Sequence, residues 1–88
     1  MLNRPSEDLF LENLGLIEHL SASICRRHGL FGADADEFAS TVKLKLIEDG
    51  YGRLRKFAGR SSLKVYLTKV IGNFFRDYRV SRWGRWRP

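Results

Sequence analysis

Apolar residues between positions 61 and 79 recur at the three- and four-residue spacing of one helix face. Those residues are Leu63, Tyr66, Leu67, Val70, Ile71, Phe74 and Tyr78. The opposite side of the same segment is polar and mostly basic, and it carries Lys64, Lys69, Asn73, Arg76 and Arg79. The pattern predicts an amphipathic helix over 61–79, and Ser61 or Ser62 can cap its first-turn amides.

A helical rhythm also runs through the first part of the chain. Its apolar positions are Leu9, Phe10, Leu14, Ile17, Ile24 and Cys25. Ser6 is a candidate cap and Gly29 a natural stop, which predicts one long helix, with a break near Gly15 as the alternative. We expect residues 1–8 to form a tail and the helix start, and residues 9–88 to form a single domain.

Another helix is predicted from the acidic cluster at 34–37, with Asp34 as its cap and Glu37 three residues further on. Its apolar face, expected in the core, comprises Ala35, Phe38, Ala39, Val42 and Leu46. A second, partly apolar face comprises Glu37, Ser40, Leu44 and Ile47. This second face is either another core contact or a protein-docking surface, and the pattern alone favours the core.

The glycines at 50 and 52 predict the end of that helix. Residues 51–60 then form a basic loop with room for one extra helical turn. No segment has the alternation of a strand, and no apolar run is long enough to span a bilayer. We therefore expect an all-α fold, a small three-helix bundle, with a four-helix bundle as the alternative.

Charge is unevenly distributed along the 88 residues, whose net charge is +6. Residues 1–50 hold five basic and nine acidic side chains, whereas residues 51–88 hold eleven basic and one acidic. The carboxyl-terminal part is therefore strongly cationic, and it is also rich in aromatic residues. This combination points to nucleic acid first and to an anionic membrane surface second.

The sequence shows no catalytic constellation, phosphate loop or paired-cysteine zinc spacing. His19 and His28 lie nine residues apart with no matching ligands, so we expect no metal site. The lone Cys25 fits a small buried hydrophobe in a reducing cytoplasm. We accordingly expect a protein that binds without catalysing, and that needs no cofactor.

Binding chemistry is concentrated in the second half of the chain. Phe57 in the basic loop offers a face on which an unstacked base can lie. Asn73 can read a base edge, or its amide can bond to a neighbouring backbone group. Gly72 is costly inside a helix, which suggests close approach of another helix or of a nucleic-acid backbone. Trp83 and Trp86 fit the core, a membrane interface or DNA equally well.

Residues 57–79 have the sequence FAGRSSLKVYLTKVIGNFFRDYR. This segment resembles region 2 of bacterial RNA polymerase sigma factors, especially the extracytoplasmic-function group. The residues that match the family pattern are Phe57, Gly59, Ser61, Ser62, Tyr66, Leu67, Asn73, Asp77 and Tyr78. The preceding helix, DADEFASTVKLKL, resembles the family's preceding helix. The resemblance covers roughly residues 9–88.

In that family the second helix docks on the clamp helices of the largest subunit of core RNA polymerase. The loop and third helix open the minus-ten promoter element and capture bases of its non-template strand. The resemblance implies that the docking face is Glu37, Ser40, Leu44 and Ile47, which reverses the preference for a core contact. It implies a base-capture and phosphate-binding set of Phe57, Gly59, Arg60, Ser61, Lys64, Lys69, Asn73, Arg76 and Arg79.

This sequence departs from the family at Ser40, where a glutamine is frequent, and its loop before Phe57 is long. A sigma factor also carries a domain for the minus-thirty-five element, and none is present up to Pro88. We therefore expect an excised domain or a truncated product. The resemblance further implies a cytoplasmic, nucleoid-associated protein, with an anti-sigma factor as a further partner and no membrane partner.

Overall fold

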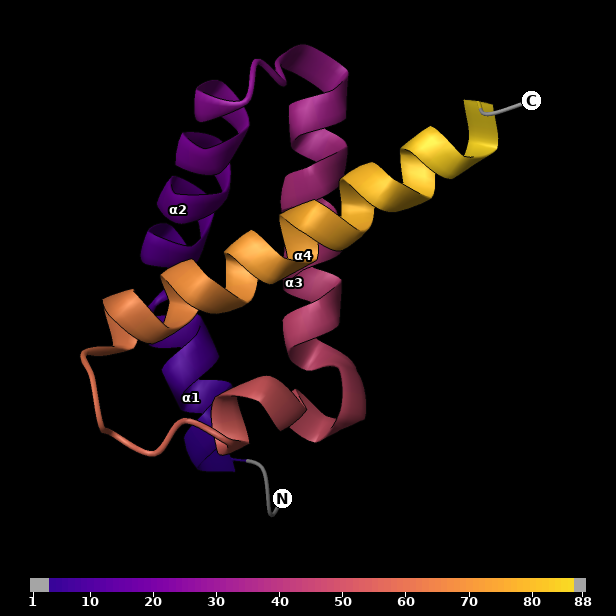
Figure 1. Cartoon of the computed structure of the whole chain (residues 1–88). Helices are drawn as coiled ribbons and strands as arrows, with labels where there is room; N and C mark the ends of the chain where they lie inside the picture. The colour runs from indigo at the N-terminus through magenta and orange to yellow at the C-terminus, as the bar shows by residue number, and fades with distance from the viewer. Residues whose placement is uncertain (1–3, 87–88) are drawn as a thin grey trace.

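The chain folds into helices in the order α1 (Arg4–Glu12), α2 (Leu14–Arg27), α3 (Gly32–Arg55) and α4 (Leu63–Trp86) (Figure 1). This computed structural model describes the backbone of residues 4–86 and the side chains of residues 5–81. Within that range there are four helices and no strand, which confirms the all-α class and the four-helix alternative, whereas the expected three-helix bundle is wrong. In the described part of the chain, no helix combines the length and the hydropathy that a transmembrane span requires.

The expected long first helix is wrong, because the chain breaks at Asn13 (φ −113°, ψ 18°). The Asn13 side chain donates from Nδ2 to the carbonyl of Leu9 at 2.9 Å. Short polar side chains that bond to nearby backbone groups compete with the helix and favour turns. The break falls just before Gly15, where the alternative put it. Ser6 lies inside α1 and is not its cap, since the helix begins at Arg4.

In the turn between α2 and α3, the predicted end of the first helix is correct and the predicted start of the next helix is wrong. Gly29 has a φ of +73°, and the N–H of Leu30 donates to the carbonyl of Cys25 at 2.8 Å, which closes the end of α2 as expected. The expected cap at Asp34 is wrong. The helix begins earlier, its N-cap residue is Phe31, and that residue makes no side-chain capping bond. Asp34 instead lies in the first turn of α3.

A left-handed turn interrupts α3 at residues 48–51. Asp49, Gly50 and Tyr51 have φ values of 56°, 59° and 62°. The Arg55 side chain holds the turn, because it donates from Nε to the Gly50 carbonyl at 3.0 Å and from Nη2 to the Asp49 carbonyl at 2.7 Å. Helical conformation therefore ends where the glycines predicted. One further turn follows before the loop, as the sequence allowed.

The core lies where α4 crosses α2 and α3 (Figure 1). Its buried apolar side chains are Phe10, Ile17, Cys25, Phe38, Val42, Leu46, Leu54, Leu67, Val70, Ile71, Phe74 and Phe75. Burying each large apolar side chain contributes about 1.5–3 kcal/mol. The apolar faces predicted for α3 and α4 are therefore confirmed as core. Phe75, which the spacing did not select, is also buried.

Aromatic contacts join the helices at the centre of the core. Phe38 of α3 meets Phe75 and Tyr78 of α4 edge-on, with ring centroids 5.1 Å and 5.3 Å apart. His28, which follows α2, stacks on the Phe75 ring, with centroids 4.9 Å apart. Such aromatic pairs add about 0.5–1.5 kcal/mol beyond the area that they bury. One ring, Phe75, thus contacts groups from both other long helices.

The short α1 packs against α3 and α2. Its Phe10 ring lies 5.7 Å from the Tyr51 ring in the left-handed turn. Partial burial raises the pKa of the Tyr51 phenol, and the nearby Glu7 carboxylate raises it further. These contacts tie the turn in α3 to the start of the chain.

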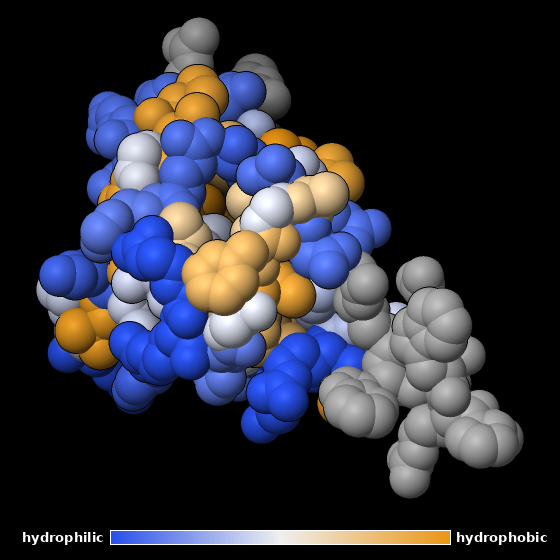
Figure 2. All heavy atoms as spheres, turned by 90° about the horizontal axis from the view of Figure 1, so that it is seen from above, coloured by the Kyte–Doolittle hydropathy of each residue, from blue (hydrophilic) through white to orange (hydrophobic). Residues whose placement is uncertain are grey.

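Figure 2 views the end of the molecule that carries the α2–α3 turn, and it shows apolar patches within a largely hydrophilic surface. Large apolar side chains that are exposed lie on α1, α3 and α4 and in this turn. They are Leu11, Phe31, Leu44, Ile47, Val65 and Val80. Among the side chains that the structure describes, only Leu44 and Ile47 of this set lie on one helix face at neighbouring positions, so α3 is the candidate for a docking surface.

We predict that Gly50→Ala destabilises the protein by about 1–2 kcal/mol, because a Cβ in the left-handed region meets the following carbonyl. The midpoint of urea unfolding measures the effect. Gly15→Ala is the control: its helical backbone leaves a new Cβ with no described atom within 4 Å, so stability rises by up to about 1 kcal/mol. Equal shifts in the two variants would contradict the left-handed turn.

Candidate nucleic-acid interface

The loop that joins α3 to α4 is fastened to α4 at Phe57. The Phe57 ring packs on the Tyr66 ring, with centroids 5.1 Å apart and planes tilted by 46°. The Tyr66 hydroxyl donates to the carbonyl of Arg53 at 2.6 Å. The N–H of Phe57 donates to the carbonyl of Leu54 at 3.1 Å. These contacts hold the first residues of the loop against α4 and against the end of α3. The Phe57 side chain nevertheless remains partly exposed.

The rest of the loop is exposed and ends in a capped helix. Gly59 has a φ of +74°, a conformation that suits glycine, and Arg60 and Ser61 follow it with exposed side chains. Ser62 accepts a hydrogen bond on Oγ from the N–H of Val65 at 3.1 Å. Of the two serines that could cap α4, Ser62 is therefore the cap. The cap fixes where the loop joins the basic helix.

Asn73 is exposed on α4, and among the described residues its side chain has no hydrogen-bond partner. The alternative in which the amide bonds to a neighbouring backbone group is therefore not observed. An exposed amide that is free to donate and to accept is the side chain that base reading requires.

The position of Asn73 on α4 gathers some of the candidate residues on one flank. At about 100° per residue, Tyr66, Lys69 and Arg76 all lie within about 60° of it. Because Phe57 packs on Tyr66, the loop aromatic belongs to the same flank. We call this set, Phe57, Tyr66, Lys69, Asn73 and Arg76, the reading strip.

Two candidate residues lie on the opposite flank of α4. Lys64 is about 180° from Asn73 around the helix, and Arg79 is about 120° from it. The Arg79 guanidinium lies 6.0 Å from the centroid of the Phe75 ring, on which His28 at the end of α2 also stacks. The structure therefore does not bring these two cations together with the reading strip.

Two other cations, which the sequence did not single out, lie over the ring of Phe74, the residue that follows Asn73 in α4. Lys45 Nζ and Arg53 Cζ lie 5.9 Å and 5.4 Å from the centroid of the Phe74 ring. The Arg53 carbonyl also accepts the hydrogen bond from Tyr66. Eight residues and the left-handed turn separate them in the chain, so no local pattern could have shown that both cover one ring.

The outer face of α3 is a surface and not a core contact, so the pattern-based preference for the core is wrong. Leu44 and Ile47 are 64% and 41% exposed, and Ser40 is exposed as well. Glu37 is also exposed, but its Oε1 accepts a hydrogen bond from the Tyr78 hydroxyl at 2.7 Å. Three of the four candidate docking residues therefore face outward, while Glu37 is bonded to α4.

Neither metal binding nor thiol chemistry has support among the described residues. They contain no group of three histidine, cysteine or acidic side chains that could hold a metal ion. Cys25 is buried, and its burial raises the pKa of the thiol, which favours the unreactive protonated form. Trp83 and Trp86, whose role the sequence left open, have side chains outside the described residues.

Comparison of the chain with protein-family models, with curated proteins and with solved structures finds no match.

We predict that Gly72→Ala stabilises α4 by about 0.5–1 kcal/mol, because a Cβ there meets no described atom within 4 Å. Close approach of another helix, one of the two explanations for this glycine, is therefore wrong. Thermal or urea unfolding measures the gain. If a nucleic-acid backbone approaches Gly72, the same variant binds oligonucleotides more weakly although it is more stable. Unchanged affinity would remove that second explanation.

Proposed function

We propose that the chain is a sigma factor region 2 domain, which docks on core RNA polymerase and recognises and melts the promoter minus-ten element. The observation that carries the proposal is the reading strip: an aromatic ring, a free amide and cations on one flank of α4. The motif run over residues 57–79 also supports it, because Phe57, Tyr66 and Asn73 of the strip stand at positions of the family pattern.

Each part of the strip has a defined task in this proposal. A base of the non-template strand stacks on the exposed side of Phe57, which contributes about 1–3 kcal/mol. Gly59, Arg60 and Ser61 form the loop around that base, and Asn73 reads its edge. Lys69 and Arg76 neutralise phosphates, and Arg53 adds positive charge beside this loop. Such contacts favour the open strand over the duplex, and this preference drives melting.

The outer face of α3 is the proposed contact with the clamp helices of the polymerase. Leu44 and Ile47 supply exposed apolar area, and Ser40 supplies a hydroxyl beside them. Buried apolar residues at the centre of an interface carry much of its binding energy. Glu37 acts at the edge of this contact, because its carboxylate already accepts the Tyr78 hydrogen bond. A cytoplasmic, nucleoid-associated location follows from these partners.

Two other functions fit part of the evidence. The first is a protein-interaction module that binds polymerase or an anti-sigma factor and reads no DNA; the exposed leucine and isoleucine of α3 favour it. Capture of polymerase without any DNA effect would select it. The second is a basic membrane-surface domain, which the net charge of +6 favours. Binding to anionic vesicles in preference to oligonucleotides would select that one.

The reading function predicts that the chain, alone or with core polymerase, binds single-stranded minus-ten oligonucleotides more tightly than scrambled ones of the same length. Fluorescence anisotropy at matched salt measures both affinities, because salt alone changes phosphate binding by orders of magnitude. Equal affinity for the two oligonucleotides in both settings would rule out sequence reading.

The roles within the strip predict different defects for two variants. Asn73→Ala should reduce discrimination between matched and mismatched bases by about 1–3 kcal/mol, because it removes the edge contact. Lys69→Ala should weaken all sequences alike and lower the salt slope by about one. Anisotropy titrations over a salt series separate the two effects. Identical behaviour of the variants would show that these roles are wrongly assigned.

The docking face predicts that Leu44→Glu lowers affinity for core RNA polymerase at least about tenfold, since a charge replaces buried apolar contact. Co-purification with core polymerase, or surface plasmon resonance, measures this. Leu11→Glu is the matched control, because it places the same charge on a leucine of α1 that is 57% exposed. If both variants bind polymerase like the unchanged chain, the contact lies elsewhere.

A further inference from the structure

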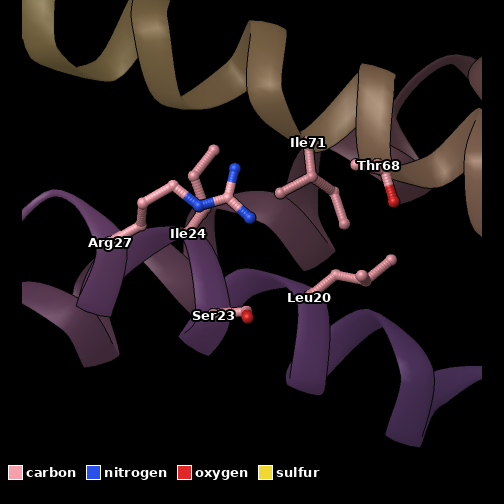
Figure 3. Close-up of a pocket in the computed structure, with 6 residues that line it drawn as sticks. All are labelled: Leu20, Ser23, Ile24, Arg27, Thr68 and Ile71. Carbon is pink, nitrogen blue, oxygen red and sulfur yellow. The ribbon is translucent and has the colours of Figure 1, made fainter.

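A small cavity opens between α2 and α4, on the opposite side of α4 from the reading strip. It encloses about 330 Å³ of empty space, part of which is open solvent. Its lining residues come from both helices and are Leu20, Ser23, Ile24, Arg27, Thr68 and Ile71 (Figure 3). Ile71, at the bottom, is 1% exposed, and Leu20 and Ile24 are partly buried. The cavity therefore has an aliphatic floor set below the surface.

Polar groups stand around this floor. Figure 3 shows the Arg27 side chain extending from α2 over the cavity, with its guanidinium directed toward Ile71. Thr68 donates from Oγ1 to the carbonyl of Lys64 at 2.7 Å, so its hydroxyl oxygen can only accept further bonds. Ser23 supplies a second hydroxyl. The rim thus offers a cation and hydroxyls above an apolar floor.

The surface around the cavity is cationic and has no acidic side chain from either helix. Around α4, Lys64 lies about 20° and Arg79 about 80° from the cavity residue Ile71, so both are on the flank that faces α2. The only acidic residue of α2, Glu18, pairs with Lys43 of α3 at 2.6 Å. The only acidic residue of α4, Asp77, lies about 140° from Lys64 around the helix, on the other flank. Neither of the two helices that line the cavity therefore supplies an acidic counterpart to its cations.

We propose that this groove binds an acidic amphipathic peptide segment of a protein partner. One aliphatic side chain of the partner fills the cavity above Ile71, and neighbouring carboxylates pair with Arg27 and Lys64. An arginine beside a recessed apolar floor is well suited to this, because its fork can bind a carboxylate while its stem covers apolar surface. The proposal is independent of DNA reading, since the reading strip lies on the other flank.

The shape of the groove favours a peptide over the two other polyanions. A nucleic-acid backbone presents phosphates and sugars, and it has no aliphatic group to fill the cavity. A membrane receives apolar side chains that project from the protein surface, whereas the floor here lies below it. Only a partner that carries both carboxylates and a projecting aliphatic side chain satisfies both parts of the site.

A displayed library of helical peptides, selected against the whole chain, tests the proposal. We expect the enriched sequences to combine leucine or isoleucine at three- and four-residue spacing with flanking aspartate and glutamate. Arg27→Glu should weaken the best peptide at least tenfold. Arg26→Glu is the matched control, because this exposed arginine lies on the same helix about 100° away from Arg27 and does not line the cavity.

A second variant and a second measurement separate the apolar from the charged contribution. Ser23→Phe fills the cavity without changing the charge, so it should abolish peptide binding. In the unchanged chain, the methyl resonances of Ile24 and Ile71 should shift when the peptide binds. Enrichment of basic or featureless peptides, or no enrichment, would overturn the proposal. An equal loss of peptide affinity in Arg27→Glu and Arg26→Glu would also overturn it. So would tighter binding of duplex DNA or phosphatidylglycerol vesicles than of the peptide at this site.

Discussion

The rotation of α4 about its own axis is the constraint on which the rest of this structure depends. It is fixed by aromatic packing: the fully buried Phe38 meets Phe75 and Tyr78 edge-on, and His28 stacks on Phe75 as well. Interdigitated rings of this kind tolerate little rotation, because protein cores are densely packed. Once that angle is set, helical geometry decides which side of α4 every polar residue occupies.

One basic helix consequently presents two different surfaces. On one flank the cations stand beside an exposed aromatic and the free amide of Asn73, which suits unstacked bases. On the other flank they stand beside a recessed aliphatic cavity between α2 and α4, which suits an acidic protein segment. A count of positive charges could not distinguish these surfaces. The groups that lie next to each charge do, and they come from different helices.

Periodicity in the sequence predicted the all-α class and the buried faces of α3 and α4, because burial imposes the same spacing on every helix. It could not predict the break at Asn13, where a side chain competes for a backbone carbonyl. It also could not predict that Lys45 and Arg53 share the Phe74 ring. That contact depends on the left-handed turn and on α4, and neither is visible in a local window. The separate flanks of Lys64 and Asn73, in contrast, follow from their spacing of nine residues in any helix, although the apolar pattern alone placed both on one polar side.

The left-handed turn at residues 48–51 places two demands on a single residue. The backbone at Tyr51 (φ +62°) favours glycine, asparagine or aspartate, whereas its ring packs on Phe10 of α1. Substitutions that relax the backbone would lose the contact with α1, and substitutions that keep the ring retain the strain. Over evolutionary time such a position is held by opposing selection. Amino-acid substitutions at residue 51 should therefore be coupled to substitutions at residue 10, so that the two sites change together or not at all.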